Sequence, residues 1–172
     1  MGRPRRERLA VASVAPSIPK PCLEGGGVEE RRSRGRWTPR RPASIVKLLL
    51  DTCTFLWLAG GGSLSAAAAA AVRDPANDVL LSAVSAWEIA SKYRAGRLPL
   101  PESPDRLIPI ERRLRGVEAL AFDEDSALQV LRLPPLHRDP FDRMLISQAI
   151  AHGLAIVTPD PSIAQYPVRV IW

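Results

Sequence analysis

Short apolar segments alternate with helix-like segments from residue 46 onward, and this alternation limits the possible folds more than any other feature. The clearest apolar segments are IVKLLL at 45–50, DVLLSAV at 78–84 and LAIVT at 154–158. Strands that alternate with helices along a chain are typical of a mostly parallel sheet covered on both faces. The pattern therefore predicts an α/β fold, in which binding sites form beyond the carboxyl ends of the strands.

The remaining elements follow from turn and capping signals. The helix predicted at 139–153 has the strongest signals, with Asp139 as N-cap, Pro140 at the first helical position and Gly153 at the end. Two further strands are expected at 117–122 and 168–172. Helical segments are expected at 54–59, 63–74 with Ser63 or Ser65 as N-cap, 85–96, 104–116 with an interruption at Pro109, and 123–133.

The first 46 residues carry much of the positive charge and lack hydrophobic periodicity. They hold 11 of the 24 Lys and Arg residues but 4 of the 18 Asp and Glu residues, so the rest of the chain is nearly balanced in charge. A segment rich in Arg, Pro and Gly cannot bury enough apolar surface to offset the entropy lost on ordering. We expect residues 1–45 to be a disordered basic extension and residues 46–172 to be the folded domain. Two alternatives stay open: the extension is an arm that binds nucleic acid, or it is not part of the mature protein.

The chain has two cysteines and no long apolar run. Cys22 falls in the basic extension and Cys53 in the folded domain, which excludes a disulfide framework or a thiolate metal cluster. We expect Cys53 to be a small core residue. No run of about 18 strongly apolar residues is present, so no membrane association by a spanning helix is expected. Together these features favour a reducing, cytoplasmic setting.

Four acidic residues fall at positions that a parallel sheet brings to one edge. Asp51 ends the first strand, and Glu88 lies in the first turn of the helix expected after the second strand. Asp142 lies in the first turn of the helix before LAIVT, and Asp160 follows that strand by two residues. Because the carboxyl ends of parallel strands meet at the same edge, we expect these side chains to lie close together.

Taken singly, each acid also has a structural interpretation. A capping-box pattern spans 85–88, and a similar pattern spans 139–142. The two acids that follow strands would bond backbone N–H groups of the next turn. Glu88 would form an i,i+4 ion pair with Lys92. Each of these interpretations predicts a stabilising contact and no chemistry.

Four such acids at one edge are harder to explain by capping alone. Two carboxylates about 4 Å apart repel by roughly 4 kcal/mol at an effective dielectric constant near 20, so their convergence calls for a countercharge. Oxygen ligands without His or Cys favour Mg²⁺, with Mn²⁺ as the alternative, over Zn²⁺. Such an ion activates water and neutralises charge that develops on a phosphate group. The pattern predicts metal-dependent phosphodiester hydrolysis, with these catalytic and metal-binding residues: Asp51, Glu88, Asp142 and Asp160.

Four segments resemble those of a known family: LLLDT, SAVSAWEIASKYRAGRLPLP, HRDPFDRMLISQA and VTPDPSIAQYPVRVIW. They are similar to segments of the PIN-domain ribonucleases, and most similar to those of the VapC toxins of type II toxin–antitoxin systems. The resemblance covers the chain from about residue 46 to its last residue. It implies a PIN-like three-layer α/β/α sandwich with a central mostly parallel sheet. It also implies an Mg²⁺- or Mn²⁺-dependent endoribonuclease that cleaves RNA, forms a homodimer and binds a cognate antitoxin protein.

Three other functions remain open at this stage. The first is a PIN-like RNA-processing nuclease that has no antitoxin. The second is a non-catalytic module that binds RNA or a protein partner, in which the acids only cap helices. The third is a phosphatase of the haloacid-dehalogenase kind, which also begins with a strand ending in Asp. That chemistry needs a second Asp two residues later, where this chain has Cys53.

Overall fold

The computed structural model describes residues 45–136 and 138–172. The extension predicted over 1–45 therefore lies, apart from Ile45, outside the described residues, and its disorder stays a prediction. Among the helices of the described ranges, none is both long and apolar enough to cross a membrane.

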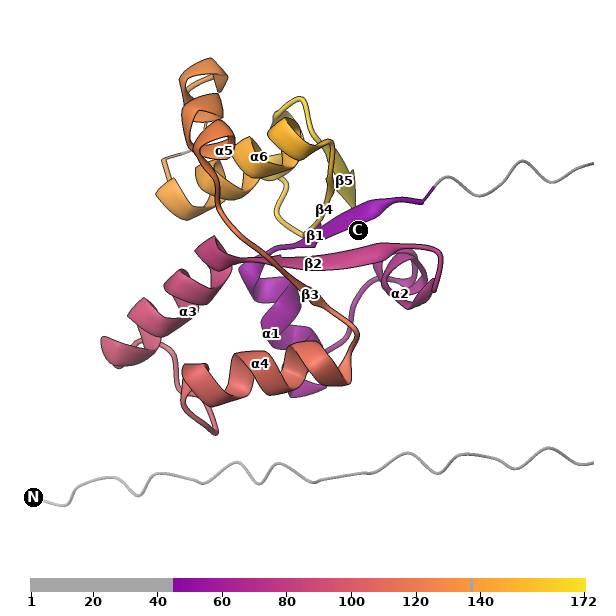
Figure 1. The fold of residues 1–172 in the computed structure, drawn as a ribbon, viewed down its shortest axis with the longest axis vertical. Helices are drawn as coiled ribbons and strands as arrows, with labels where there is room; N and C mark the ends of the chain where they lie inside the picture. Colours follow the sequence, from indigo (N-terminus) through magenta and orange to yellow (C-terminus); the bar gives the residue numbers. More distant parts are fainter. Residues whose placement is uncertain (1–44, 137) are drawn as a thin grey trace, which may run out of the picture. The chain divides into compact units, whose positions relative to one another are not determined.

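Five strands of the described residues form one sheet in the order β3-β2-β1-β4-β5, and each neighbouring pair is parallel (Figure 1). The prediction of a mostly parallel sheet is confirmed. The strands are β1 (Lys47–Leu50), β2 (Asp78–Ser82), β3 (Glu118–Leu120), β4 (Ala155–Val157) and β5 (Arg169–Ile171).

Helices connect the strands, and most of them begin at a side chain that caps the first turn. Ser65 accepts a hydrogen bond from the backbone N–H of Ala68, which confirms Ser65 as an N-cap. The helices are α1 (Thr52–Gly60), α2 (Ala66–Arg73), α3 (Ala83–Arg94), α4 (Pro104–Leu114), α5 (Glu124–Gln129) and α6 (Pro140–His152). Two short 3₁₀ turns, η1 (Val130–Arg132) and η2 (Ile163–Gln165), complete the described elements.

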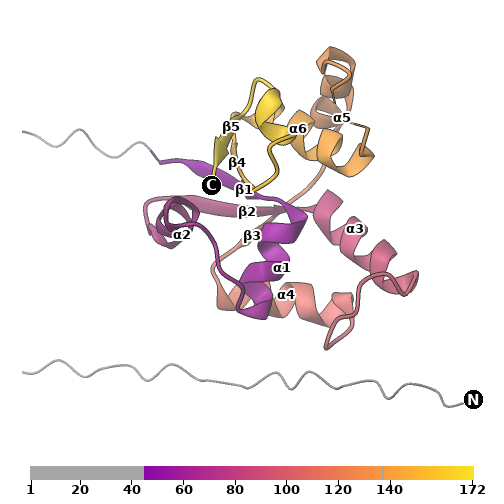
Figure 2. The same ribbon diagram turned by 180° about the vertical axis from the view of Figure 1, so that it is seen from behind.

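Alternate residues of the central strand point to opposite faces of the sheet, and helices cover each face. In β1, Leu48 and Leu50 pack with apolar residues of α1, α2, α3 and α4, whereas Leu49 packs with residues of α6. All three leucines are fully buried. Figures 1 and 2 show α1, α3 and α4 on one side of the sheet and α5 and α6 on the other. The three-layer α/β/α sandwich is confirmed.

Two predicted boundaries were wrong. The second strand was expected to run to residue 84, but β2 ends at Ser82. The side-chain oxygen of Ser82 accepts the backbone N–H of Val84, and α3 begins two residues earlier than expected. The helix at 104–116 was expected to be interrupted at Pro109. Instead, α4 continues through Pro109 to Leu114.

Candidate active site

Asp51 lies where the buried strand β1 ends and α1 begins. Its Oδ1 accepts a hydrogen bond from the backbone N–H of Thr54 at 2.6 Å, so Asp51 is the N-cap of α1. Its Oδ2 accepts a hydrogen bond from the hydroxyl of Thr158, which follows the neighbouring strand β4. The side chain is 7% exposed. The capping interpretation is thus confirmed, but it accounts for one of the two carboxylate oxygens.

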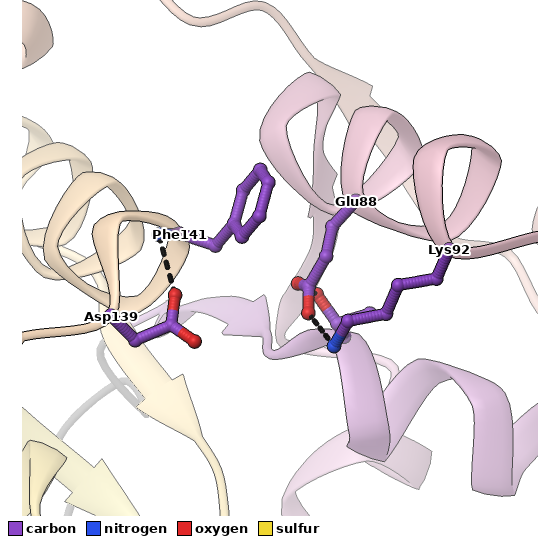
Figure 3. Close-up of polar contacts among 5 residues, drawn as sticks. Glu88, Lys92, Asp139 and Phe141 are labelled. Atoms are coloured by element: carbon purple, nitrogen blue, oxygen red, sulfur yellow. Dashed lines mark hydrogen bonds and ion pairs between the residues drawn. The ribbon is translucent and has the colours of Figure 1, made fainter. Parts of the chain in front are cut away.

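Glu88 lies on α3 and is held by residues from two helices. The hydroxyl of Thr52 on α1 donates to Glu88 Oε2 at 2.6 Å. The ammonium group of Lys92, one turn further along α3, contacts Glu88 Oε1 (Figure 3). The predicted i,i+4 pair is therefore present. Thr52 directly follows Asp51, so its hydrogen bond brings Glu88 to the N-terminal end of α1, where Asp51 is the N-cap.

The capping-box interpretation of Glu88 was wrong. Because α3 begins at Ala83 with Ser82 as its N-cap, Glu88 lies in the second turn of the helix. Ser85 is buried inside the helix rather than at its start. Helix capping therefore does not explain why Glu88 is buried at this edge of the sheet.

Burial and neighbouring charges shape the ionisation of this site. Burial raises the pKa of Asp51 above its ordinary value, with a smaller contribution from the charge of Glu88, while hydrogen bonds from Thr158 and Thr54 oppose the rise. The hydrogen bond to Glu88 raises the pKa of Lys92. Removing a carboxylate from water disfavours its charged form, so a cation at this place would stabilise Asp51.

Cys53 is the second residue of α1, and neighbouring charges shift the pKa of its thiol. It was expected to be a core residue, but it is exposed. Burial of part of the thiol raises its pKa, and the charges of Asp51, Glu88 and Asp142 raise it further. The positive charge of Lys92 opposes these three. That Asp142 lies beside Asp51 and Glu88 stays a prediction.

Asp142 belongs to α6, in the layer opposite α1 and α3, and its place among the acids of the site stays a prediction. It lies in the first turn of α6, next to the N-cap Asp139, which accepts the backbone N–H of Phe141 at 2.8 Å. Figure 3 shows the carboxylate of Asp139 and the N-terminus of α6 facing Glu88 and Lys92 on α3. Helices from both faces of the sheet thus bring acids to the same edge.

Asp160 is connected to Asp51 through Thr158. Its backbone N–H donates to Thr158 Oγ1 at 3.1 Å, and the same hydroxyl donates to Asp51. Its own carboxylate accepts the backbone N–H of Ser162 at 2.7 Å, as the structural interpretation predicted. These contacts show how Asp160 orders the loop that holds Thr158. A role for Asp160 as a metal ligand stays a prediction.

The donor chemistry of the site suits a hard cation. In residues 45–136 and 138–172, no group of three or more His, Cys, Asp or Glu side chains lies close enough together to hold a metal ion, so a site with three carboxylates requires side chains to move. An ionised carboxylate offers about four lone-pair positions. Asp51 and Glu88 each accept two of the hydrogen bonds described above, so both retain acceptor capacity. Oxygen donors of this kind are the ligands that Mg²⁺ and Mn²⁺ prefer.

Two of the hydroxyls that hold Asp51 and Glu88 are harder to assign from the sequence. From its position after Asp51, Thr52 is consistent with a cap of the following turn, yet its hydroxyl donates to Glu88. Thr158 was as consistent with a strand end as with support of an acid, and it donates to Asp51. Thr158 directly follows β4, and Thr52 follows Asp51 at the end of β1. Their position at the same edge of the sheet is the sequence signal that they support the acids there.

Comparisons with known proteins agree with this arrangement. The sequence model that describes the PIN domain matches residues 48–168. Over 54 residues the chain is 48% identical to Ribonuclease VapC16 of Mycobacterium tuberculosis (strain ATCC 25618 / H37Rv). This alignment spans 31% of the chain and 38% of the relative, so the chain matches less than half the length of that curated protein.

Two solved structures share the fold at low sequence identity. VapBC2 from Rickettsia felis, solved bound to a DNA fragment from its promoter, has a TM-score of 0.55 at 15% identity. DNA-bound VapBC from Salmonella typhimurium has a TM-score of 0.51 at 18% identity. Each comparison covers 73% of this chain and 97% of the other chain. At such identities the likeness supports the fold, and the activity has to be argued from the site.

Proposed function

This chain belongs to the PIN domain family, and from that premise we propose that it is a metal-dependent endoribonuclease that hydrolyses phosphodiester bonds in RNA. The observation that carries the proposal is the pair of buried acids, Asp51 and Glu88, at the carboxyl edge of the sheet, where Thr52, the residue after Asp51, donates to Glu88. Buried carboxylates in this number are costly unless a cation or a reaction requires them. The name of the relative Ribonuclease VapC16 supports the same activity.

We assign the metal-binding role to Asp51, Glu88 and Asp142, with Asp160 as the fourth acid of the set. A bound Mg²⁺, or Mn²⁺ in its place, would activate water and neutralise the charge that develops on phosphate. The protein's own part is positioning. Thr158 orients Asp51, Thr52 orients Glu88, and the buried setting of both acids strengthens their electrostatic effect.

The experiment for this function is RNA cleavage by the purified protein in Mg²⁺, in Mn²⁺ and in EDTA. We expect cleavage with either ion and none in EDTA. Glu88→Gln keeps the size of the side chain and its bond from Thr52 but removes the charge, so it should abolish cleavage while circular dichroism stays unchanged. Full activity of a folded Glu88→Gln protein, or cleavage in EDTA, would refute the assigned mechanism.

We also propose that the protein is the toxin of a toxin–antitoxin pair in the cytoplasm, as a homodimer with a cognate antitoxin. The support is that the matched structures from Rickettsia felis and Salmonella typhimurium carry the name VapBC and that the curated relative carries the name VapC. Induced expression should arrest growth, and co-expression of a small neighbouring reading frame should restore it. Growth without arrest despite RNA cleavage in vitro would instead indicate an RNA-processing nuclease. Mapping 5′ ends after brief induction would identify the RNA that is cut.

A further inference from the structure

Lys92 holds one of the two oxygens that Glu88 presents to the site. Its ammonium group contacts Glu88 Oε1, while the Thr52 hydroxyl donates to Oε2 at 2.6 Å (Figure 3). Glu88 is thus held between an uncharged donor from α1 and a positive charge from its own helix. The position of Lys92 therefore controls how much negative charge Glu88 offers to anything else that binds there.

The side chain of Lys92 is freer to move than that of Glu88. The side chain of Lys92 is 42% exposed, whereas that of Glu88 is 9% exposed. A lysine side chain has a flexible four-carbon stem, so its ammonium group can change partners without moving α3. A divalent cation in the place of Lys92 would keep a positive charge beside Glu88, so the exchange leaves no buried carboxylate unpaired. Glu88 is fixed by the bond from Thr52, and Lys92 is the partner that can leave.

Two carboxylates act on the Lys92 ammonium. They are those of Asp139, at the start of α6, and of Glu88 on the same helix as Lys92. Figure 3 shows the Asp139 carboxylate facing the contact between Lys92 and Glu88. Lys92 thus supplies positive charge at the place where the carboxylates of two layers face one another.

We propose that Lys92 competes with a divalent cation for Glu88, and that the displaced ammonium group then binds a phosphate group of the RNA. The inference rests on the proposed nuclease function. Two cations at one carboxylate repel each other, so the contact of Lys92 with Glu88 weakens metal binding. Phosphate oxygens are the acceptors that RNA brings to a lysine near the cleavage site. Lys92 is therefore a positioning residue for Glu88 before RNA binds and a phosphate ligand afterwards.

The first measurement is Mn²⁺ binding to the protein without RNA, by calorimetry or electron paramagnetic resonance. Lys92→Met should bind Mn²⁺ about threefold to tenfold more tightly than the wild type, because the competing charge is gone. Lys47→Met is the matched control. Lys47 is exposed and lies at the amino end of β1, the end opposite Asp51, so its loss should leave Mn²⁺ affinity unchanged.

The second measurement is RNA cleavage at saturating Mn²⁺. The KM of Lys92→Met for RNA should rise by about tenfold with a smaller change in kcat, and Lys92→Arg should restore KM because it keeps a positive charge. A merely structural lysine would not tighten metal binding and weaken RNA binding at once. These opposite signs are the signature of the proposal.

Equal or weaker Mn²⁺ binding by folded Lys92→Met, with wild-type binding intact, would overturn the competition. An unchanged KM would overturn the phosphate contact. If wild-type protein binds no Mn²⁺ with or without RNA, the nuclease function itself fails and this inference fails with it. Lys92→Gln repeats both measurements with a polar side chain, so that a folding defect specific to the methionine variant does not decide the result.

Discussion

Asp51 and Asp123 each cap the N-terminus of a helix, α1 and α5 respectively, but their pKa values are shifted in opposite directions. Each is an N-cap whose Oδ1 accepts a backbone N–H three residues later, from Thr54 at 2.6 Å and from Ser126 at 2.9 Å. Hydrogen bonding by Ser126, with a smaller effect of His152, lowers the pKa of Asp123. The pKa of Asp51 is raised instead, because burial outweighs its hydrogen bonds.

The difference separates capping from site formation. A cap at the surface favours the charged carboxylate, since the helix N–H groups bind it and water solvates the rest. Asp51 makes the same cap but is 7% exposed at the edge where strands β1 and β4 end. Capping therefore explains where both acids stand along the chain. It does not explain why Asp51 is kept out of water beside Glu88, and the proposed cation does.

The largest expected effect is on RNA cleavage, which should depend on Asp51 and not on Asp123. Asn is as good an N-cap as Asp, so Asp51→Asn and Asp123→Asn should both fold with their helices intact. RNA cleavage by Asp51→Asn should fall by about a thousandfold, in the range seen when a charge-stabilising group is lost. Cleavage by Asp123→Asn should stay within about twofold of the wild type. Similar losses in both variants, measured with the same RNA, would contradict the comparison.

A smaller effect concerns the hydroxyl of Thr158, which donates to Asp51 from the neighbouring strand end. Thr158→Val keeps the shape of the side chain but removes the donor to Asp51 Oδ2 and the acceptor for the Asp160 N–H. The free energy of unfolding in urea should fall by about 1–3 kcal/mol, because buried polar groups lose their partners. Thr158→Ser keeps the hydroxyl and should recover most of this loss. Equal losses in both variants would assign the effect to packing.

Thr158→Val should also shift the pH dependence of cleavage. The hydrogen bond from Thr158 lowers the pKa of Asp51, so its removal should raise that pKa further. The acidic limb of the pH–rate profile should therefore move to higher pH in Thr158→Val and stay in place in Thr158→Ser.

The smallest effect is the pH dependence of stability, and its sign is opposite for the two acids. The pKa of Asp51 is raised in the folded protein, so its contribution to stability is fully present below 3.8 and is lost as the pH rises through the folded pKa. The pKa of Asp123 is lowered, so its contribution is present above 3.8 and is lost as the pH falls through the folded pKa.

At pH 7, Asp51→Asn should therefore raise the free energy of unfolding and Asp123→Asn should lower it. Both differences from the wild type should shrink as the pH falls, and urea denaturation between about pH 3 and pH 7 measures them. A decrease of the same sign in both variants at pH 7 would show that burial does not oppose the charge of Asp51.

Much of the fold could be predicted because its signals are local. The helix α6 carries its own start and end, with Asp139 and Pro140 at one terminus and Gly153 at the other, and the structure confirms them. The boundary between β2 and α3 could not be predicted in the same way. Ser82 and Ser85 are equally good caps in the sequence, and the choice depends on which serine lies at the end of the paired strand.

The candidate site shows the same division. The sequence by itself determined that Asp51 and Asp160 would follow parallel strands that end at the same edge, because residue position and the parallel pairing of strands are enough to predict which ends meet. Only the tertiary structure decided that Thr158 binds Asp51, that Thr52 binds Glu88 and that Cys53 faces solvent. These outcomes depend on how residues distant in the chain pack against one another, and packing sets burial and hydrogen-bond partners that no local pattern encodes.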